Sequence, residues 1–111
     1  MKLRSDATID PAKFTLYLLL PQSRSDKSRY LDRAGYSPQN VEVLIEDLRL
    51  QILPREATLS RATPFGEMYF IDGALTGPNG RRISLRTIWQ KDPLSDRVHF
   101  VTLIPQPSPT A

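Results

Sequence analysis

The fold of this chain is decided by residues 69–91, which read YFIDGALTGPNGRRISLRTIWQK. Two runs of alternating apolar and polar residues flank the turn residues Gly77-Pro78-Asn79-Gly80, a pattern that indicates two antiparallel strands joined tightly. Pro and Asn suit the centre of a type I turn, and Gly80 suits the left-handed position that follows it. We therefore predict a three-residue loop that pairs Gly77 with Arg81.

The predicted turn fixes the register of the two strands, and a slip of one residue would reverse every assignment. Counting outward, the buried face pairs Leu75 with Ile83, Gly73 with Leu85, Ile71 with Thr87 and Tyr69 with Trp89. The other face pairs Thr76 with Arg82, Ala74 with Ser84, Asp72 with Arg86 and Phe70 with Ile88. The clean separation of apolar from polar side chains favours this register.

Outside the hairpin, residues 9–53 show helical periodicity and residues 57–105 show the alternation of strands. Three helices are predicted: from the Asp10 cap and Pro11 to Leu20, over Ser25–Ala34 with Gly35 as its stop, and from the Ser37 cap to the residue before Pro54. The third carries a buried stripe of Val41, Leu44, Ile45, Leu48 and Ile52. Strands are predicted at Ala57–Ala62, Glu67–Thr76, Arg81–Lys91 and Arg97–Ile104.

These elements predict an α+β fold in which two to three N-terminal helices pack on one face of a four-stranded, mainly antiparallel sheet. Val98, Phe100, Thr102 and Ile104 alternate with His99, Val101 and Leu103, so the last strand is apolar on both sides and is expected to be central or covered. Residues 1–105 form a single domain, and residues 106–111 form a Pro-rich tail that we expect to be disordered or extended.

Composition excludes several classes of function. The chain of 111 residues has no cysteine and one histidine, which excludes disulfides, thiol catalysis and sites rich in Cys or His. Neither a cofactor nor a metal is expected, because the glycine loops and metal-binding motifs are missing. The N-terminus lacks the apolar run of a signal peptide, and Leu16–Leu20 is too short to cross a bilayer. We expect a cytoplasmic protein without a membrane partner, and its net charge of +3 weakly favours an anionic partner.

The polar face of the hairpin is the first candidate site. Arg82, Ser84 and Arg86 can bind phosphate groups, or Arg86 can form a cross-strand ion pair with Asp72 on a solvated face.

Two further side chains could extend this site. Lys27 lies on or beside the apolar stripe of its helix and either extends past the core edge or points into a cleft between helix and sheet. His99 is either a structural residue or a group for proton transfer near neutral pH.

Motifs along nearly the whole chain resemble a small bacterial domain family without an assigned activity, found alone and at the C-termini of phage- or toxin-associated proteins. They are Ile9-Asp10-Pro11 before Tyr17-Leu18-Leu19, Lys27 before Gly35-Tyr36, Asn40 to Leu44, Thr76 to Arg81, Thr87-Ile88-Trp89 and Val101 to Pro105. The layout is similar to ribonuclease toxins of the barnase, colicin D and RelE type. That resemblance implies a site at Lys27, Arg81, Thr87 and Thr102.

Three functions follow. The first is a metal-independent ribonuclease that binds RNA phosphates in a basic cleft through Lys27 and Arg81, with Thr87, Thr102 or His99 near the scissile group and Arg82 and Arg86 in support. The second is a non-enzymatic binding or assembly module whose sheet face docks a cognate immunity protein, an antitoxin or a second copy. The third is an RNA binder without catalysis.

Overall fold

The computed structural model describes residues 2–15 and 27–106. Its four strands are β1 (Thr58–Thr63), β2 (Gly66–Thr76), β3 (Arg82–Lys91) and β4 (Val98–Pro105). They form one antiparallel sheet in the order β1-β2-β3-β4. The four predicted strands are confirmed, and each boundary lies within one residue of its predicted position.

The predicted register of the β2–β3 hairpin is confirmed at every pair from Tyr69 with Trp89 to Thr76 with Arg82. The Gly77 N–H donates to the Arg81 carbonyl at 2.9 Å, and Gly80 has a φ of 83°. Gly77 also lies so close to the carbonyl of Ala34 that an added Cβ would come within 2.0 Å of it. The turn is therefore packed against the segment that follows the first helix.

The short helix α1 spans Lys27–Asp32. It ends in a Schellman motif, in which the Tyr36 N–H donates to the Leu31 carbonyl and the Gly35 N–H donates to the Asp32 carbonyl. Gly35 has a φ of 94°, which a residue with a side chain adopts only with strain. The predicted stop at Gly35 is confirmed.

The main helical segment runs through a 3-10 turn η2 (Pro38–Asn40), the helix α2 (Val41–Asp47) and a π-helical end η3 (Leu48–Ile52). Ser37 caps it as predicted, and the Asn40 side chain accepts a hydrogen bond from the Ser37 N–H at 2.7 Å. The predicted stripe is confirmed, with Leu44, Leu48 and Ile52 fully buried and Val41 and Ile45 partly buried.

Within residues 2–15 and 27–106, the expectation of two to three packed helices is corrected to one main helix and one short helix. At the first predicted helix, Asp10 accepts a hydrogen bond from the Ala12 N–H at 3.0 Å, and one helical turn forms over residues 12–15. Residues 16–20 of that prediction lie outside the described part of the chain. A cap fixes where a helix begins, whereas its length depends on tertiary packing that local signals do not encode.

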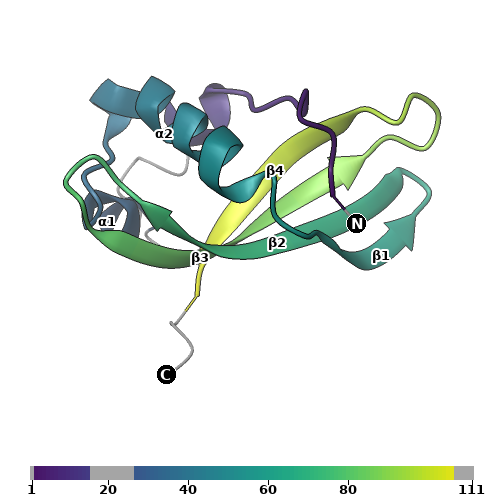
Figure 1. The fold of residues 1–111 in the computed structure, drawn as a ribbon. Coiled ribbons are helices and arrows are strands. Elements are labelled where there is room, and N and C mark those ends of the chain that lie inside the picture. Colours follow the sequence, from purple (N-terminus) through teal and green to yellow (C-terminus); the bar gives the residue numbers. More distant parts are fainter. Residues whose placement is uncertain (1, 16–26, 107–111) are drawn as a thin grey trace.

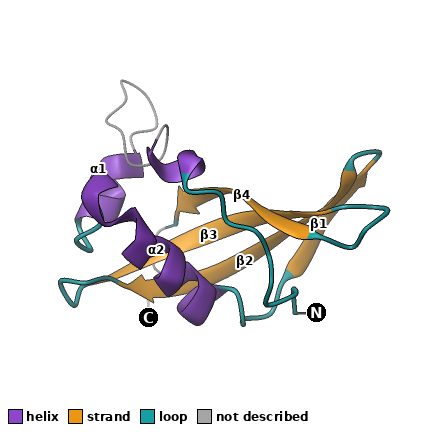
Figure 2. Ribbon diagram, turned by 90° about the horizontal axis from the view of Figure 1, so that it is seen from above, coloured by secondary structure: helices purple, strands orange, loops and turns teal. Residues whose placement is uncertain are grey.

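Figures 1 and 2 show both helices on the same side of the sheet, over the half that contains the β2–β3 turn. The core lies between these layers. At its centre Phe100 stacks on Phe14 with ring centroids 5.1 Å apart and meets Trp89 edge-on at 5.3 Å. The opposite side of the sheet, called here the outer face, carries neither helix.

β4 is an edge strand and not a central one, but its edge is covered. Thr8 pairs with it in parallel: the Thr8 N–H donates to the Val98 carbonyl and the Phe100 N–H donates to the Thr8 carbonyl, both at 2.8 Å. A bulge leaves Val101 unpaired between Phe100 and Thr102. Because the bulge reverses the alternation, Leu103 joins the core, whereas the sequence pattern placed it on the side opposite Phe100.

The described part of the chain contains no helix that is both long and apolar enough to cross a membrane. Of the predicted tail, the Gln106 N–H donates to the Ser84 carbonyl at 3.1 Å and so extends the ladder of β4 beside β3. Residues 107–111 lie outside the description, and the prediction for them stays a prediction.

Candidate functional site

The outer face carries the three residues that we predicted from the sequence to bind anions. Arg82, Ser84 and Arg86 alternate along β3 and face away from the core. The Arg86 guanidinium donates to both oxygens of Asp72, at 2.7 and 2.9 Å, and lies 4.0 Å from the centroid of the Phe70 ring. This hydrogen-bonded carboxylate raises the pKa of Arg86. The ion-pair interpretation of this face is therefore the one that the structure adopts, and Arg86 would have to release Asp72 to bind a phosphate.

Around this ion pair lie four apolar side chains, called here the outer-face patch: Met68 and Phe70 on β2, Ile88 on β3, and Ile104 on β4, which lies opposite Arg86. The register places Phe70 beside Ile88, and Ile88 beside Thr102 of the edge strand. Ile104 is 44% exposed, and the other three are half-buried. The patch sits on a hydrogen-bonded sheet, so its shape is fixed before any partner arrives.

Lys27 and Thr102 are brought together as the resemblance implied. The Lys27 ammonium at the start of α1 donates to the Thr102 hydroxyl on β4 across 3.3 Å, although the two residues are 75 positions apart. Burial lowers the pKa of Lys27. A partly desolvated lysine beside a hydroxyl can hold an anionic group and exchange a proton more readily than a solvated lysine.

Thr87 is not part of this pair. It faces the core between β2 and β4 and is fully buried. Its hydroxyl donates to the Ile71 carbonyl at 3.1 Å and accepts from the Trp89 indole N–H at 2.8 Å. Within the fold, the Thr87 hydroxyl provides the hydrogen-bond acceptor for the buried Trp89 indole N–H.

Arg81 and His99 lie apart from Lys27 and from each other. Arg81 is exposed at the end of the β2–β3 turn, where its N–H donates to the Asn79 side chain at 2.9 Å. Asn79 in turn contacts the backbone beyond the far end of α1, so the length of the helix separates Arg81 from Lys27. His99 is exposed on the outer face beside Gln90. Of the five residues proposed for catalysis, only Lys27 and Thr102 are thus in contact. The other three lie at separate positions in the fold.

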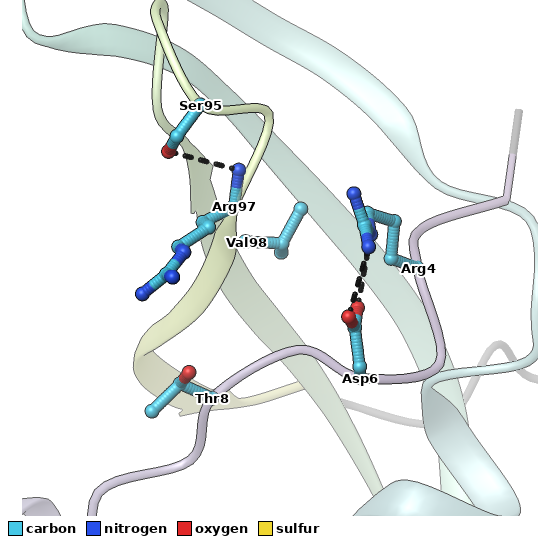
Figure 3. A pocket seen from close by; sticks show the side chains of 6 residues that line it. All are labelled: Arg4, Asp6, Thr8, Ser95, Arg97 and Val98. Atoms are coloured by element: carbon cyan, nitrogen blue, oxygen red, sulfur yellow. Dashed lines mark hydrogen bonds and ion pairs between the residues drawn. The ribbon is translucent and has the colours of Figure 1, made fainter.

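A polar pocket of about 420 Å³ was missed by the sequence reasoning. It lies between the N-terminal segment and the β3–β4 loop, and its lining residues are Arg4, Asp6, Thr8, Ser95, Arg97 and Val98 (Figure 3). The signal that could have indicated it is an alternation in residues 3–9: Leu3, Ala7 and Ile9 are buried, and Arg4, Asp6 and Thr8 between them are exposed. The described residues include no group of three His, Cys, Asp or Glu side chains placed to hold a metal.

A family described as a domain of unknown function, DUF6883, matches residues 2–107. The chain belongs to the DUF6883 family. No curated protein matches it. Among solved structures, the DUF6883 domain is similar to a chain of a contact-dependent growth inhibition toxin–immunity protein complex from Klebsiella pneumoniae 342. The TM-score is 0.65 and the identity 18%, and the match covers 94% of this chain and 97% of that chain. At this identity the likeness shows a shared fold.

Proposed function

We propose that this domain acts by forming a specific complex with a protein partner, and that the outer-face patch is the surface that docks it. The observation that carries the proposal is the patch itself: apolar side chains from three adjacent strands, with charged groups around them, on a sheet face that neither helix covers. Protein interfaces commonly combine an apolar centre with a polar rim. The fold likeness to a chain from a toxin–immunity protein complex supports a partner that is a protein.

The charges on the outer face favour an acidic partner: Arg61 lies beside Met68 of the patch, and Arg82 lies further along β3, opposite Thr76. Asp72 is already bound by Arg86, whereas Arg82 on β3 and Arg61 on β1 have no side-chain partner among the described residues. Two uncompensated guanidinium groups on one face attract carboxylates, and such complementarity speeds association and excludes cationic surfaces.

The test compares two variants in which an exposed apolar side chain becomes an aspartate. Ile104→Asp places a carboxylate in the patch, and the matched control Leu50→Asp changes a residue that is 65% exposed on η3. The wild-type domain is used to capture proteins from the bacterium of origin, each captured protein is purified, and its affinity for the three domains is measured by calorimetry.

We expect Ile104→Asp to weaken binding at least tenfold, because the carboxylate loses its water at the interface. Leu50→Asp should bind within twofold of wild type. A purified partner that binds wild type, Ile104→Asp and Leu50→Asp equally would exclude the patch as the docking surface. If none of the captured proteins binds the purified wild-type domain, the proposal is overturned.

A second candidate function rests on the contact between Lys27 and Thr102. In a metal-independent ribonuclease, the RNA 2′-hydroxyl attacks the neighbouring phosphorus, and the 5′-oxygen leaves with a proton. An ammonium group in a partly buried position can bind the phosphate and stabilise the charge that develops on it. The contact supports this function because it brings together two residues that the resemblance to ribonuclease toxins implied.

Incubation with total RNA tests this candidate. Wild type should cut RNA at defined positions without added metal, Lys27→Ala should lose the cleavage, and Lys13→Ala, which removes a lysine of the N-terminal segment, should keep it. Cleavage that survives in Lys27→Ala, or no cleavage by wild type, would reject the ribonuclease candidate and leave the protein-binding function standing.

A further inference from the structure

The polar pocket beside the β3–β4 loop has two walls, and hydrogen bonds from backbone N–H groups hold each of them in place. On one wall, pairing of Thr8 with β4 fixes residues 4–8 against the edge of the sheet. On the other, the Asp92 side chain accepts hydrogen bonds from the Leu94 and Ser95 N–H groups, at 2.8 and 3.1 Å, and Ser95 accepts one from the Arg97 N–H at 3.3 Å. A pocket with walls fixed in this way exists before its ligand binds.

The charge available in the pocket is positive. Arg4 donates to both oxygens of Asp6, at 3.0 and 2.9 Å, so these two charges compensate each other. The pKa of Asp6 is lowered chiefly by the hydrogen bond to Arg4 and to a smaller extent by the nearby charge of Arg97. The Arg97 guanidinium has no hydrogen bond or ion pair with any described residue. Figure 3 shows Arg97 on the wall opposite Arg4 and Asp6, with Val98 between them.

A second, smaller pocket adjoins the first and shares Arg4 and Val98 with it. It adds the side chains of Lys2 and Lys91 as well as the carboxylate of Asp96. The two pockets together carry four cationic side chains against two acidic ones. Lys91 is already ion-paired with Asp96 at 3.6 Å and with Glu67 at 3.9 Å, so the remaining positive excess comes from Arg97 and Lys2. This excess favours an anionic ligand over a neutral one.

Two apolar side chains are exposed on the loops beside the pockets. Leu94 on the β3–β4 loop is 95% exposed and Phe65 in the β1–β2 turn is 79% exposed. The two loops are joined, because the Gln90 side chain donates to the Phe65 carbonyl at 2.8 Å and a Cβ on Gly66 would meet Pro93 at 3.2 Å. Exposed apolar side chains beside a charged pocket give a protein partner apolar area next to a polar contact, a combination that protein interfaces use.

We propose that this end of the molecule binds an acidic segment of a protein: Arg97 pairs with a carboxylate that enters the pocket, and Leu94 and Phe65 contact apolar side chains beside that carboxylate. A guanidinium group binds a carboxylate through two parallel hydrogen bonds, and the hydroxyls of Thr8 on the N-terminal wall and Ser95 on the loop wall can donate to the same group. The proposal rests on the proposed function only in that the acidic segment belongs to the protein partner. Its surface is separate from the outer-face patch.

The experiment uses the full chain, labelled for NMR, and two peptides. The probe is acetyl-Leu-Glu-Asp-Leu-amide, and its neutral counterpart replaces the acidic residues by Gln and Asn. The acidic peptide should shift the signals of residues 4–8 and 94–97, including the Arg97 side chain, and the shifts should weaken as salt is added. The neutral peptide should bind at least fivefold more weakly.

Two variants locate the site. Arg97→Gln should weaken binding of the acidic peptide at least fivefold, whereas Arg33→Gln, which removes an exposed arginine beside the β2–β3 turn at the other end of the sheet, should leave it unchanged. Since Arg97 is exposed, its replacement should not unfold the chain, and the spectrum of the variant shows this directly. Leu94→Ser should weaken binding of the same peptide two- to threefold.

Several results would overturn the proposal: shifts spread over the whole surface, equal losses in Arg97→Gln and Arg33→Gln, or equal binding of the two peptides. Inorganic phosphate or the RNA dinucleotide UpU binding the pocket more tightly than the acidic peptide would also overturn it, because the site would then take phosphate. Loss of the captured partner in Ile104→Asp, together with full binding in Arg97→Gln, would reject this site and leave the proposed function intact.

Discussion

Replacing Thr87 by valine should destabilise the fold by about 2 kcal/mol. Valine has nearly the same shape but no hydroxyl, so the fully buried Trp89 indole N–H loses its acceptor. A buried donor without a partner costs about 1–3 kcal/mol, and the lost bond to the Ile71 carbonyl adds roughly 0.5–1.5 kcal/mol. Burial of the additional methyl group offsets about 0.8 kcal/mol of this cost.

The measurement is urea unfolding followed by far-UV circular dichroism and by the fluorescence of Trp89, the one tryptophan of the chain. Thr87→Ser is the matched control, because it keeps the hydroxyl and loses only a methyl group, at a cost of about 1 kcal/mol. For a domain of this size, 2 kcal/mol corresponds to a melting temperature lower by roughly 8 °C. A Thr87→Val protein within 0.5 kcal/mol of wild type, or a serine variant that is less stable than the valine variant, would refute the role given to the hydroxyl.

Three further changes test other parts of the fold. Gly77→Ala should destabilise the protein by about 2–4 kcal/mol in the same urea assay, because the added methyl group would clash with the backbone after α1. Gly80→Ala is the control and should cost about 1 kcal/mol, because Gly80 has open space around it. Equal costs for the two variants would contradict the packing of the turn against Ala34. Ser37→Ala should cost about 1 kcal/mol by removing the helix cap, and an unchanged midpoint would show that the cap is dispensable. Burial and then the hydrogen bond to Asp47 raise the pKa of Tyr36, so its contribution to the free energy of unfolding should be constant below pH about 10 and should fall above it as the unfolded tyrosine loses its proton. In Tyr36→Phe the free energy of unfolding should fall less steeply above pH about 10. An equally steep fall in the variant would show that other groups cause it.

The parts of the fold that depend on short-range chemistry could be predicted from the sequence. The turn from Gly77 to Gly80 determined the register of ten residue pairs, because loop length sets which residues oppose each other. The Ser37 cap and the Gly35 stop were equally readable, since each acts on hydrogen bonds within a few residues.

Features that depend on distant contacts could not be predicted. The bulge at Val101 arises from how β4 fits beside β3, and nothing in the run from Val98 to Ile104 marks which residue is left unpaired. The pairing of Thr8 with β4 joins positions about ninety residues apart, so the pocket that it forms has no local signature.

In the candidate site, too, the features set by local sequence could be predicted and those set by distant contacts could not. Alternation along β3 placed Arg82, Ser84 and Arg86 on one face, and the ion pair between Arg86 and Asp72 was among the two interpretations offered for it. The contact of Lys27 with Thr102 came from the resemblance to a family and not from spacing. Thr87 shows the limit of such transfer, because a position carried over by resemblance is enclosed in the core.

The parallel pairing of Thr8 with β4 has a practical consequence for anyone who shortens this chain to produce it. A version that begins after Ile9 would uncover the backbone groups of Val98 and Phe100, to which residue 8 is now bonded. An uncovered strand edge is a template onto which another chain can add. Residues 2–9 therefore protect this part of the strand edge from pairing with another chain, and adding a tag ahead of them is a safer modification than removing them.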